Sequence, residues 1–141
     1  MFSTDTQIRV RYAETDQMGI VHHSNYAIFF EIGRTDFFAE HFVHYHQLEQ
    51  QGLFAPLLEL ELKLKHPARY GDILVLETRP ELLKGLSLSM VYQIVNQDQT
   101  TIATGRTLHA LCGPNLKPVH PRQFGALYQT MKSIFAPNPA N

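Results

Sequence analysis

Two different spacings of hydrophobic residues divide the chain into predicted helices and strands. Residues 7–12 alternate apolar and charged side chains, which is typical of a half-buried strand. An aromatic-rich segment follows, in which Phe30, Phe37 and Phe38 recur at i, i+7 and i+8. This spacing places the three rings on one helix face, and a serine–asparagine pair at 24–25 offers a cap for the helix start. The chain is therefore expected to open with a strand and a long helix.

Two glycines add detail to this helical region. Gly33 lies in the middle of the long helix, where glycine costs about 1 kcal/mol relative to alanine. We expect close packing against another backbone to explain its presence there. Gly52 lies where the helical pattern has loosened, and it predicts the end of a second, shorter helix.

From residue 58 onward the hydrophobic spacing changes to two, which predicts a set of strands. Turns rich in glycine or polar residues separate these strands. Pro121 then opens a last helix, because proline fits the first helical position, and residues 137–141 are expected to fray. The strands of this set are predicted over residues 58–65, 73–78, 86–94 and 101–112.

The order strand, long helix, four strands, helix predicts an α+β fold. Consecutive strands with short turns favour an antiparallel sheet. No other predicted helix is long enough to cover the aromatic helix, so we expect the sheet to curl around it. The prediction is a curved five-stranded antiparallel sheet around a long central helix, in a single domain over residues 1–141. Such a layer leaves a sheet edge and the helix ends uncovered, which predicts a homodimer.

Composition narrows the class of protein. Hydrophobic residues make up 44% and charged residues 18% of the 141 residues, which excludes a disordered chain. The net charge of -1 gives no basic excess for binding nucleic acid. No apolar stretch approaches the roughly 18 residues of a membrane span and no signal peptide is evident, so we expect a cytoplasmic protein. The single cysteine, Cys112, excludes an internal disulfide.

The densest group of reactive side chains lies in residues 14–26, directly before the long helix, and includes two carboxylates and two imidazoles. A helix N-terminus offers unpaired N–H groups that can hold a developing oxyanion. Asp16 beside it can act as base or nucleophile on the same carbonyl. The alternative is structural, since Asp16 can begin a turn that Gly19 closes, while His23 or Ser24 caps the helix.

The same segment resembles the signature of the 4-hydroxybenzoyl-CoA thioesterase family. Residues 11–26 read RYAETDQMGIVHHSNY. The matching elements are the aspartate, a glycine three residues later, Ile-Val, and an Asn-Tyr that enters a long helix. Glu31 and Arg34 continue the match, as do the segments 67–72 and 117–121. The resemblance spans nearly the whole chain, and it implies a hotdog fold and an acyl-CoA thioesterase.

The resemblance also implies roles for individual residues. Asp16 stands at the position of the family's catalytic carboxylate. The backbone N–H of His23 stands where the family holds the thioester carbonyl, and one branch of the family also has a histidine side chain there. We therefore predict that Asp16 and His23 are catalytic. Substrate contacts are predicted for Gly19, Val21, His22, Asn25, Tyr26, Glu31 and Lys84.

Two of the predicted substrate contacts have ordinary alternatives. Glu31 lies at i+8 from His23 and can project toward the same end of the helix. It can equally be buried or paired with Arg34 at i+3, which is the interpretation we favour. Lys84 can meet the phosphates of coenzyme A, or it can be an ordinary solvated charge.

The predicted reaction needs no cofactor. Coenzyme A leaves as a thiolate, and a thiol pKa of about 8.5 makes it a good leaving group. One carboxylate, one water and an oxyanion site are then sufficient, without a strong general acid. Three histidines at 41, 44 and 46 lack matching further ligands, so no metal site is predicted.

Two other functions are compatible with the sequence. A hydratase or dehydratase acting on a thioester would pair His22 or His23 with Glu31 to move a proton at carbon. A protein that binds acyl thioesters without turnover is the second alternative, and the presence of Asp16 before Gly19 argues against it. The predicted partner is an acyl-CoA, with acyl carrier protein as an alternative carrier, and the predicted assembly is a homodimer or homotetramer.

Overall fold

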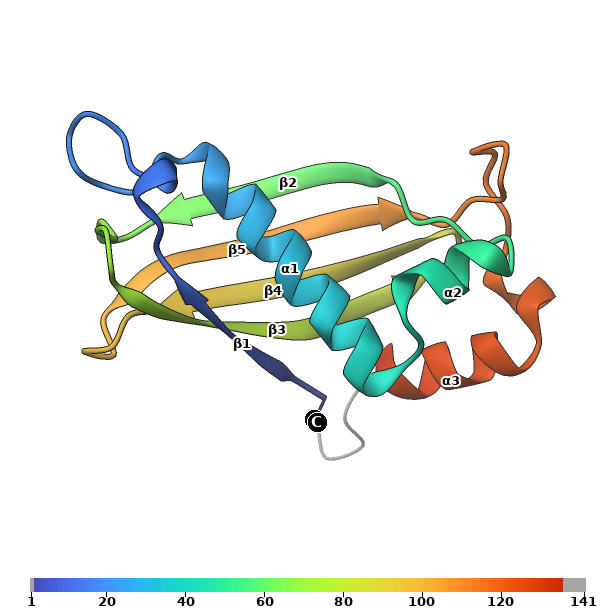
Figure 1. The fold of residues 1–141 in the computed structure, drawn as a ribbon. Coiled ribbons are helices and arrows are strands. Elements are labelled where there is room, and N and C mark those ends of the chain that lie inside the picture. Colours follow the sequence, from blue (N-terminus) through green and yellow to red (C-terminus); the bar gives the residue numbers. More distant parts are fainter. Residues whose placement is uncertain (1, 136–141) are drawn as a thin grey trace.

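The structure, a computed structural model, describes residues 2–135. A five-stranded antiparallel sheet curves around helix α1 (Figure 1). The strand order is β1-β3-β4-β5-β2, so β1 and β2 form the edges. The strands are β1 (Thr4–Arg9), β2 (Leu57–Leu64), β3 (Ile73–Lys84), β4 (Ser87–Val95) and β5 (Thr101–Ala110). The helices are α1 (Ser24–His41), α2 (Tyr45–Gln50) and α3 (Ala126–Phe135), with short 3₁₀ turns at Tyr12–Glu14 and Pro121–Phe124.

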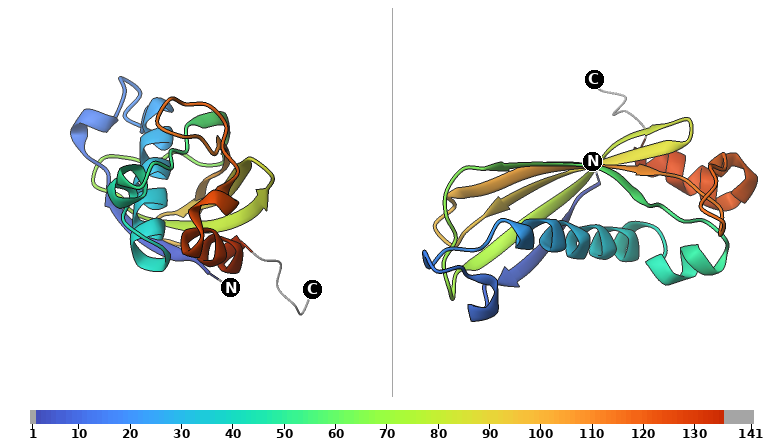
Figure 2. Two further views of the ribbon diagram at one scale, coloured as in Figure 1. Left: turned by 90° about the vertical axis from the view of Figure 1, so that its right-hand side faces the viewer. Right: turned by 90° about the horizontal axis from the view of Figure 1, so that it is seen from above.

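The arrangement confirms the predicted α+β fold, with α1 as the central helix. Figure 2 shows α1 along one side of the curved sheet, while α2 and α3 lie near the end remote from the start of α1. Every pair of neighbouring strands is antiparallel, and short turns join β3 to β4 and β4 to β5 as predicted. The start of α1 is therefore left at the opposite end of the sheet, where the loop from β1 enters the helix.

The first strand lies earlier in the chain than predicted. β1 covers residues 4–9 rather than 7–12, and its inward side chains include two buried threonines. The Thr4 hydroxyl donates to Glu40 Oε2 at 2.6 Å, and the Thr6 hydroxyl donates to Asp36 Oδ2 at 2.7 Å. These bonds fix β1 to α1 through polar groups, so the hydrophobic alternation begins later than the strand does.

The third strand and the C-terminal helix also differ from the prediction. β3 continues to Lys84 instead of ending at Thr78, because β4 pairs with it from Val75 to Lys84. The helix predicted from Pro121 is divided into a 3₁₀ turn and α3. Gly125 separates them with φ +56°, a left-handed conformation that interrupts a helix and suits glycine. The expectation of fraying at 137–141 lies outside the described residues.

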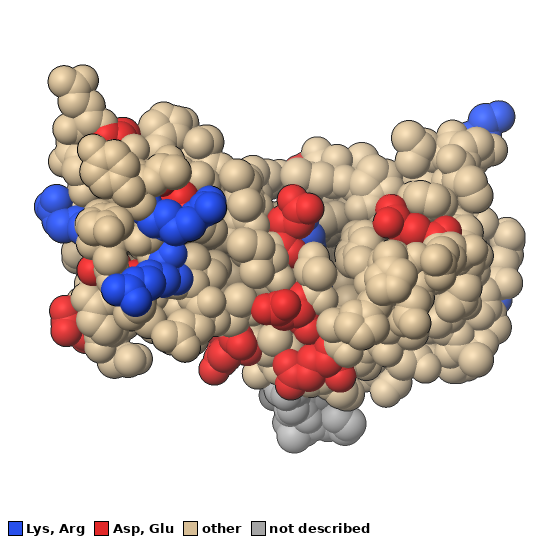
Figure 3. Space-filling view, in the orientation of Figure 1, with Lys and Arg blue, Asp and Glu red and all other residues tan. Residues whose placement is uncertain are grey.

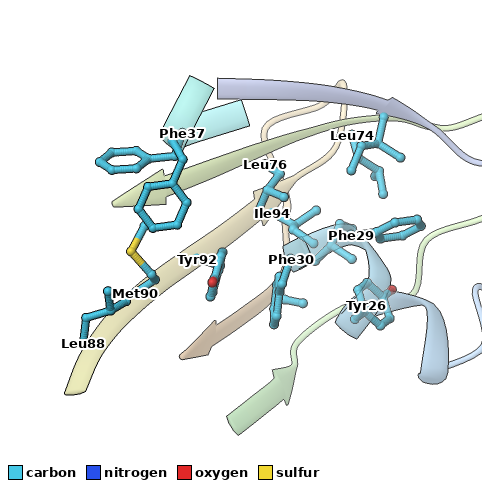
Figure 4. Packing of buried hydrophobic residues seen from close by; sticks show 14 of the residues in the cluster. Tyr26, Phe29, Phe30, Phe37, Leu74, Leu76, Leu88, Met90, Tyr92 and Ile94 are labelled. Atoms are coloured by element: carbon cyan, nitrogen blue, oxygen red, sulfur yellow. The ribbon is translucent and has the colours of Figure 1, made fainter. Parts of the chain in front are cut away.

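The core consists of the aromatic face of α1 packed onto the sheet. Phe29, Phe30, Phe37 and Phe38 are all buried, which confirms the predicted helix face. Figure 4 shows the rings of Phe29, Phe30 and Phe37 facing apolar side chains from the strands. Phe30 stacks on Tyr92 of β4 with ring centroids 4.3 Å apart and an interplanar angle of 11°. Burial of large rings is the main stabilising term for a helix lying on a sheet.

Two glycines permit the close approach of α1 to the sheet. A Cβ at Gly33 would lie 2.6 Å from Leu76 Cδ2 and would also meet the Thr78 hydroxyl. A Cβ at Gly105 would overlap the ring of Phe30. The prediction of close packing at Gly33 is therefore right, but its neighbours are side chains of β3 rather than another backbone.

A chain of hydrogen bonds crosses this core beneath α1. Arg34 Nη1 donates to Tyr92 Oη at 3.3 Å, and that hydroxyl lies 2.7 Å from Thr107 Oγ1. Thr107 Oγ1 lies 2.9 Å from His109 Nε2, and His109 Nδ1 lies 3.1 Å from the Ala55 carbonyl oxygen. The groups are all satisfied when His109 is neutral with its proton on Nδ1. Burial, together with the charge of Arg34, lowers the pKa of His109 to about 4.

The edge strand β2 is more exposed than its sequence pattern predicts. It pairs with β5 along one side, and four of its five leucines are exposed, whereas Leu62 packs partly against the core. Leu58 and Leu60 are 58% and 43% exposed, and Leu64 is 56% exposed. The alternation of leucine with charged residues predicts the strand correctly but not the burial of its apolar face. An apolar edge strand with unpaired backbone groups is suited to pairing with another chain.

Candidate active site

The loop between β1 and α1 closes into a tight turn around Asp16. The Asp16 N–H donates to the Ile20 carbonyl at 2.8 Å, and the Gly19 N–H donates to the Asp16 carbonyl at 2.9 Å. Gly19 adopts φ +81°, which glycine reaches without a Cβ clash. The predicted turn from Asp16 to Gly19 is therefore present.

The two oxygens of the Asp16 carboxylate have different surroundings. Oδ1 accepts a hydrogen bond from the Met18 N–H at 2.8 Å and a longer one from the Ile20 N–H at 3.5 Å. Within residues 2–135 no hydrogen bond is made to Oδ2, and the side chain is half-buried. The backbone thus orients the carboxylate, while Oδ2 can accept a proton from water or attack a carbonyl carbon.

The start of α1 is capped by His22. Its Nδ1 accepts from the Ser24 N–H at 3.3 Å and lies 2.8 Å from Ser24 Oγ. His23 occupies the N-cap position, as one alternative predicts, but its side chain makes no capping hydrogen bond, so the side-chain contact at the helix start comes from His22. Within the described chain the backbone N–H of His23 donates to no acceptor. This N–H lies at the positive end of an 18-residue helix, where it can hold an oxyanion.

The side chains of Asn25 and Tyr26 hold the loop and helix together. Asn25 Nδ2 donates to the Glu14 carbonyl at 2.9 Å and to the His22 carbonyl at 3.3 Å. Tyr26 is buried, and its ring packs edge-on against Phe29 with centroids 5.8 Å apart. Burial raises the pKa of Tyr26 to about 12, so the phenol stays neutral. The Asn25 side chain therefore links the loop to the start of α1. Tyr26 lines the pocket described next.

A pocket of about 280 Å³ opens beside the loop. One wall comes from the loop and α1, and the other from the end of β2. The Val21 N–H donates to the Ala68 carbonyl at 2.8 Å and fastens the two walls together. The pocket is lined by Ile20, Val21, Tyr26, Leu64, Lys65, His66 and Pro67. The sequence identified the loop wall, but the β2 wall depends on contacts between residues more than 40 positions apart.

Glu31 and Lys84 are not brought into this cluster. Glu31 is exposed and, within the described chain, forms no ion pair, so the expected pairing with Arg34 is wrong. Arg34 instead donates to Tyr92. Lys84 ends β3, eleven residues beyond Ile73, which pairs with Arg9 near the loop. At about 3.3 Å per residue this is about 36 Å of strand, so Lys84 lies far from Asp16 within one chain.

The described part of the chain offers few other sites. No group of three or more His, Cys, Asp or Glu side chains within residues 2–135 is arranged to hold a metal ion. Cys112 is buried. None of the helices in the described ranges is long and apolar enough to cross a membrane. Two further pockets are lined by charged side chains, one by Glu31 and Asp36 of α1 and one by residues of β2 to β5 that include Arg79 and Arg106. The pocket beside the loop is the one lined by Ile20 and Val21, which follow the turn around Asp16.

Solved structures define the class of protein to which this fold and site belong. A DHNA-CoA thioesterase from Staphylococcus aureus superposes with a TM-score of 0.90 and 30% sequence identity, covering 96% of this chain and 93% of that one. A sheet curved around a central helix in this way is the hotdog fold of thioesterases, which confirms the fold that the sequence motif implies.

The sequence family agrees with the fold. The model of the thioesterase-like superfamily matches residues 10–120, and the chain belongs to this superfamily. Bacillus subtilis YneP is 38% identical over 96 residues, covering 68% of this chain and 70% of that protein. The acyl-CoA thioester hydrolase YbgC of Escherichia coli O157:H7 is 30% identical over 117 residues, covering 79% and 84%. The chain is therefore a thioester hydrolase, as the motif over residues 11–26 predicts.

Proposed function

We propose that this thioesterase hydrolyses an acyl-CoA, with Asp16 as the catalytic carboxylate and the His23 N–H as the oxyanion donor. The observation that supports this most is which polar groups of the loop are hydrogen-bonded and which are left without a partner. Backbone N–H groups bind one oxygen of Asp16 and leave the other available. His22 caps the helix and leaves the adjacent N–H without an acceptor. The names of YbgC and of the Staphylococcus aureus enzyme support coenzyme A as the carrier.

The reaction requires only water, the Asp16 carboxylate and the His23 N–H. Water attacks the thioester carbonyl as Asp16 Oδ2 takes its proton, or Oδ2 attacks first and water then opens the mixed anhydride. In either route the carbonyl oxygen becomes negative beside the His23 N–H. Collapse of the tetrahedral intermediate breaks the C–S bond and releases the thiolate of coenzyme A. The products are the free acid and coenzyme A.

The acyl group is proposed to occupy the pocket beside the loop. Most of the pocket-lining side chains are apolar, and Val21 and Tyr26 form its wall nearest the start of α1. The volume of about 280 Å³ suits a compact acyl or aryl group better than a long chain in one subunit. Lys65 and His66 at the same pocket add polar contacts for the pantetheine amides.

A homodimer through β2 is part of this proposal. The strand offers an unpaired backbone edge, and four exposed leucines accompany it. Leu64 belongs both to this edge and to the pocket wall, so a partner on β2 would lie directly beside the bound acyl group. Burial of the leucines would supply the favourable energy of association.

The rival hydratase or dehydratase activity has less support. It requires Glu31 to work with His22 or His23, but Glu31 lies eight residues, about 12 Å, further along the helix. A single assay separates the activities. The protein is incubated with acetyl-, hexanoyl-, palmitoyl- and benzoyl-CoA, and free thiol is measured alongside hydration of crotonyl-CoA. We expect thiol release without hydration, and fastest with the compact acyl groups. Hydration without thiol release would contradict the proposal.

A further inference from the structure

Two exposed tyrosines meet at the surface close to the Asp16 loop. Tyr12 is 79% exposed and Tyr70 is 66% exposed, and their rings are 5.9 Å apart at an interplanar angle of 77°. The two residues come from segments 58 positions apart in the sequence. A pair of large rings held together in solvent presents an aromatic face without a partner in the folded chain.

Hydrogen bonds fix this pair between β1 and the active-site loop. The Val10 N–H donates to the Asp72 carbonyl at 2.9 Å, and the Gly71 N–H donates to the Val10 carbonyl at 3.0 Å. Arg69 forms a β-bridge with Ile20, which directly follows the turn around Asp16. The backbone that carries the two tyrosines is therefore hydrogen-bonded to the segment that contains the proposed catalytic site.

Three arginines flank the two tyrosines in the sequence, Arg9 and Arg11 before Tyr12 and Arg69 before Tyr70. Arg9, Arg11 and Arg69 are all exposed, and Figure 3 shows Lys and Arg gathered over the end of β1 at the left of the molecule. Arg11 pairs with Glu14 at 3.2 Å, but 74% of its side chain stays accessible. Within residues 2–135, Arg9 and Arg69 form no ion pair. This surface, made of Tyr12, Tyr70, Arg9, Arg11 and Arg69, is called the Tyr–Arg patch below.

The acidic residues nearby are already engaged. Glu14 is buried and accepts from both the backbone and the side chain of Arg11. Asp72 Oδ2 accepts from the Arg69 N–H at 2.8 Å, and Asp72 Oδ1 accepts from Gln97 at 3.1 Å. The arginine guanidinium groups are therefore left to face solvent, where they favour a ligand rich in negative charge.

We propose that the Tyr–Arg patch binds the nucleotide end of the acyl-CoA substrate. Coenzyme A ends in adenosine with a 3′-phosphate and a 5′-diphosphate, which combines a planar base with several negative charges. The base would stack on a tyrosine ring, and the phosphates would meet the arginines. The proposal rests on the acyl-CoA activity proposed above, and it replaces Lys84 as the expected phosphate contact within one chain.

The test compares two substrates that share a thioester but differ in the nucleotide. Hydrolysis of an acyl-CoA and of the corresponding S-acyl-pantetheine is measured for wild type, Tyr70→Ala, Tyr70→Phe and Arg69→Ala. Arg79→Ala is the matched control, because Arg79 pairs with Glu77 on β3, away from the patch. We expect Tyr70→Ala and Arg69→Ala to raise KM for the acyl-CoA by about tenfold with kcat unchanged. Tyr70→Phe should keep the wild-type KM.

The acyl-pantetheine kinetics should be the same for all variants, and KM for the acyl-CoA alone should rise with salt. Equal effects on both substrates, or no effect on either, would overturn the proposal. So would a changed molecular mass for Tyr70→Ala, which would assign the patch to contact between copies of the chain. Binding of adenosine 3′,5′-bisphosphate is also measured in the Asp16→Asn background, where it tests nucleotide binding by the patch independently of the catalytic role of Asp16. Its loss with Arg69→Ala supports the patch even if Asp16 is not catalytic.

Discussion

The Nδ1 atom of His22 lies 2.8 Å from Ser24 Oγ and accepts the Ser24 N–H at 3.3 Å, so the imidazole caps α1. The adjacent residue, His23, has its side chain exposed and without a capping bond. Its ring is tilted against that of His22, with centroids 4.2 Å apart. We therefore expect His23 to act in the site through its backbone N–H rather than through its imidazole.

This assignment predicts opposite results for two substitutions of His23. His23→Ala keeps the N–H, so we expect kcat to stay within a few fold of wild type. His23→Pro removes the N–H, and the native φ of −56° is close to the value that proline requires. We expect His23→Pro to lower kcat about 10²–10³-fold, the usual loss for one oxyanion donor. Steady-state hydrolysis of one acyl-CoA, with a thermal melt of each variant, measures both effects. A large loss with His23→Ala would instead assign catalysis to the imidazole.

The exposed edge of β2 predicts a dimer through this strand. One charged substitution in the strand should disrupt that dimer. Leu60→Lys places a cation in the centre of the apolar strand, and we expect it to convert the protein to a monomer with much reduced activity. Leu116→Lys is the control, because Leu116 is 62% exposed in the loop after β5. Light scattering should give at least twice the 16.2 kDa chain mass for wild type and for the control. A wild-type monomer at micromolar concentration would contradict the dimer.

The buried imidazole of His109 predicts a loss of stability in mild acid. Its pKa is lowered to about 4 in the folded chain, whereas an unfolded chain titrates near 6.5. Between these values the unfolded state binds a proton that the folded state does not, so stability falls as the pH drops from about 6.5 to 4. The full loss in the free energy of unfolding is about 3 kcal/mol, because each unit of pKa difference between the two states contributes about 1.36 kcal/mol.

Urea unfolding between pH 7 and 4 measures this dependence. His109→Gln should be less stable at pH 7 because it disturbs the hydrogen bond to Thr107, but its stability should vary less with pH. His66→Gln is the control, since His66 is exposed. An unchanged pH dependence in His109→Gln would show that other groups cause the acid sensitivity.

The sequence predicted the fold and the loop around Asp16 because both depend on local signals. Hydrophobic spacing identifies the strands and α1, and the motif at 11–26 is contiguous in the chain. The leucines of β2 show the limit of this reasoning, because alternation indicates a strand but not which neighbour covers its face. Within residues 2–135, Leu58, Leu60 and Leu64 stay exposed.

The cations near the loop were missed for a related reason. Lys84 lies in a predicted turn, but the length of β3 carries it to the other end of the sheet. Arg69 lies beside Ile20 through a bridge between residues 49 positions apart, and no local pattern encodes that contact. Likewise, His22 became the cap because the loop geometry turns its ring toward Ser24. Long-range pairing and side-chain rotamers decide such details.

The central claim is that Asp16 is the catalytic carboxylate, and Asp16→Asn tests it most directly. Asparagine keeps an oxygen that can accept the Met18 N–H, so the loop and the melting temperature should be preserved. Asp98→Asn is the control, because Asp98 is exposed at the β4–β5 turn. With an acyl-CoA that wild type hydrolyses, we expect kcat to fall about 10²–10⁴-fold for Asp16→Asn and to stay unchanged for the control. Retention of most activity in a folded Asp16→Asn protein would contradict the account.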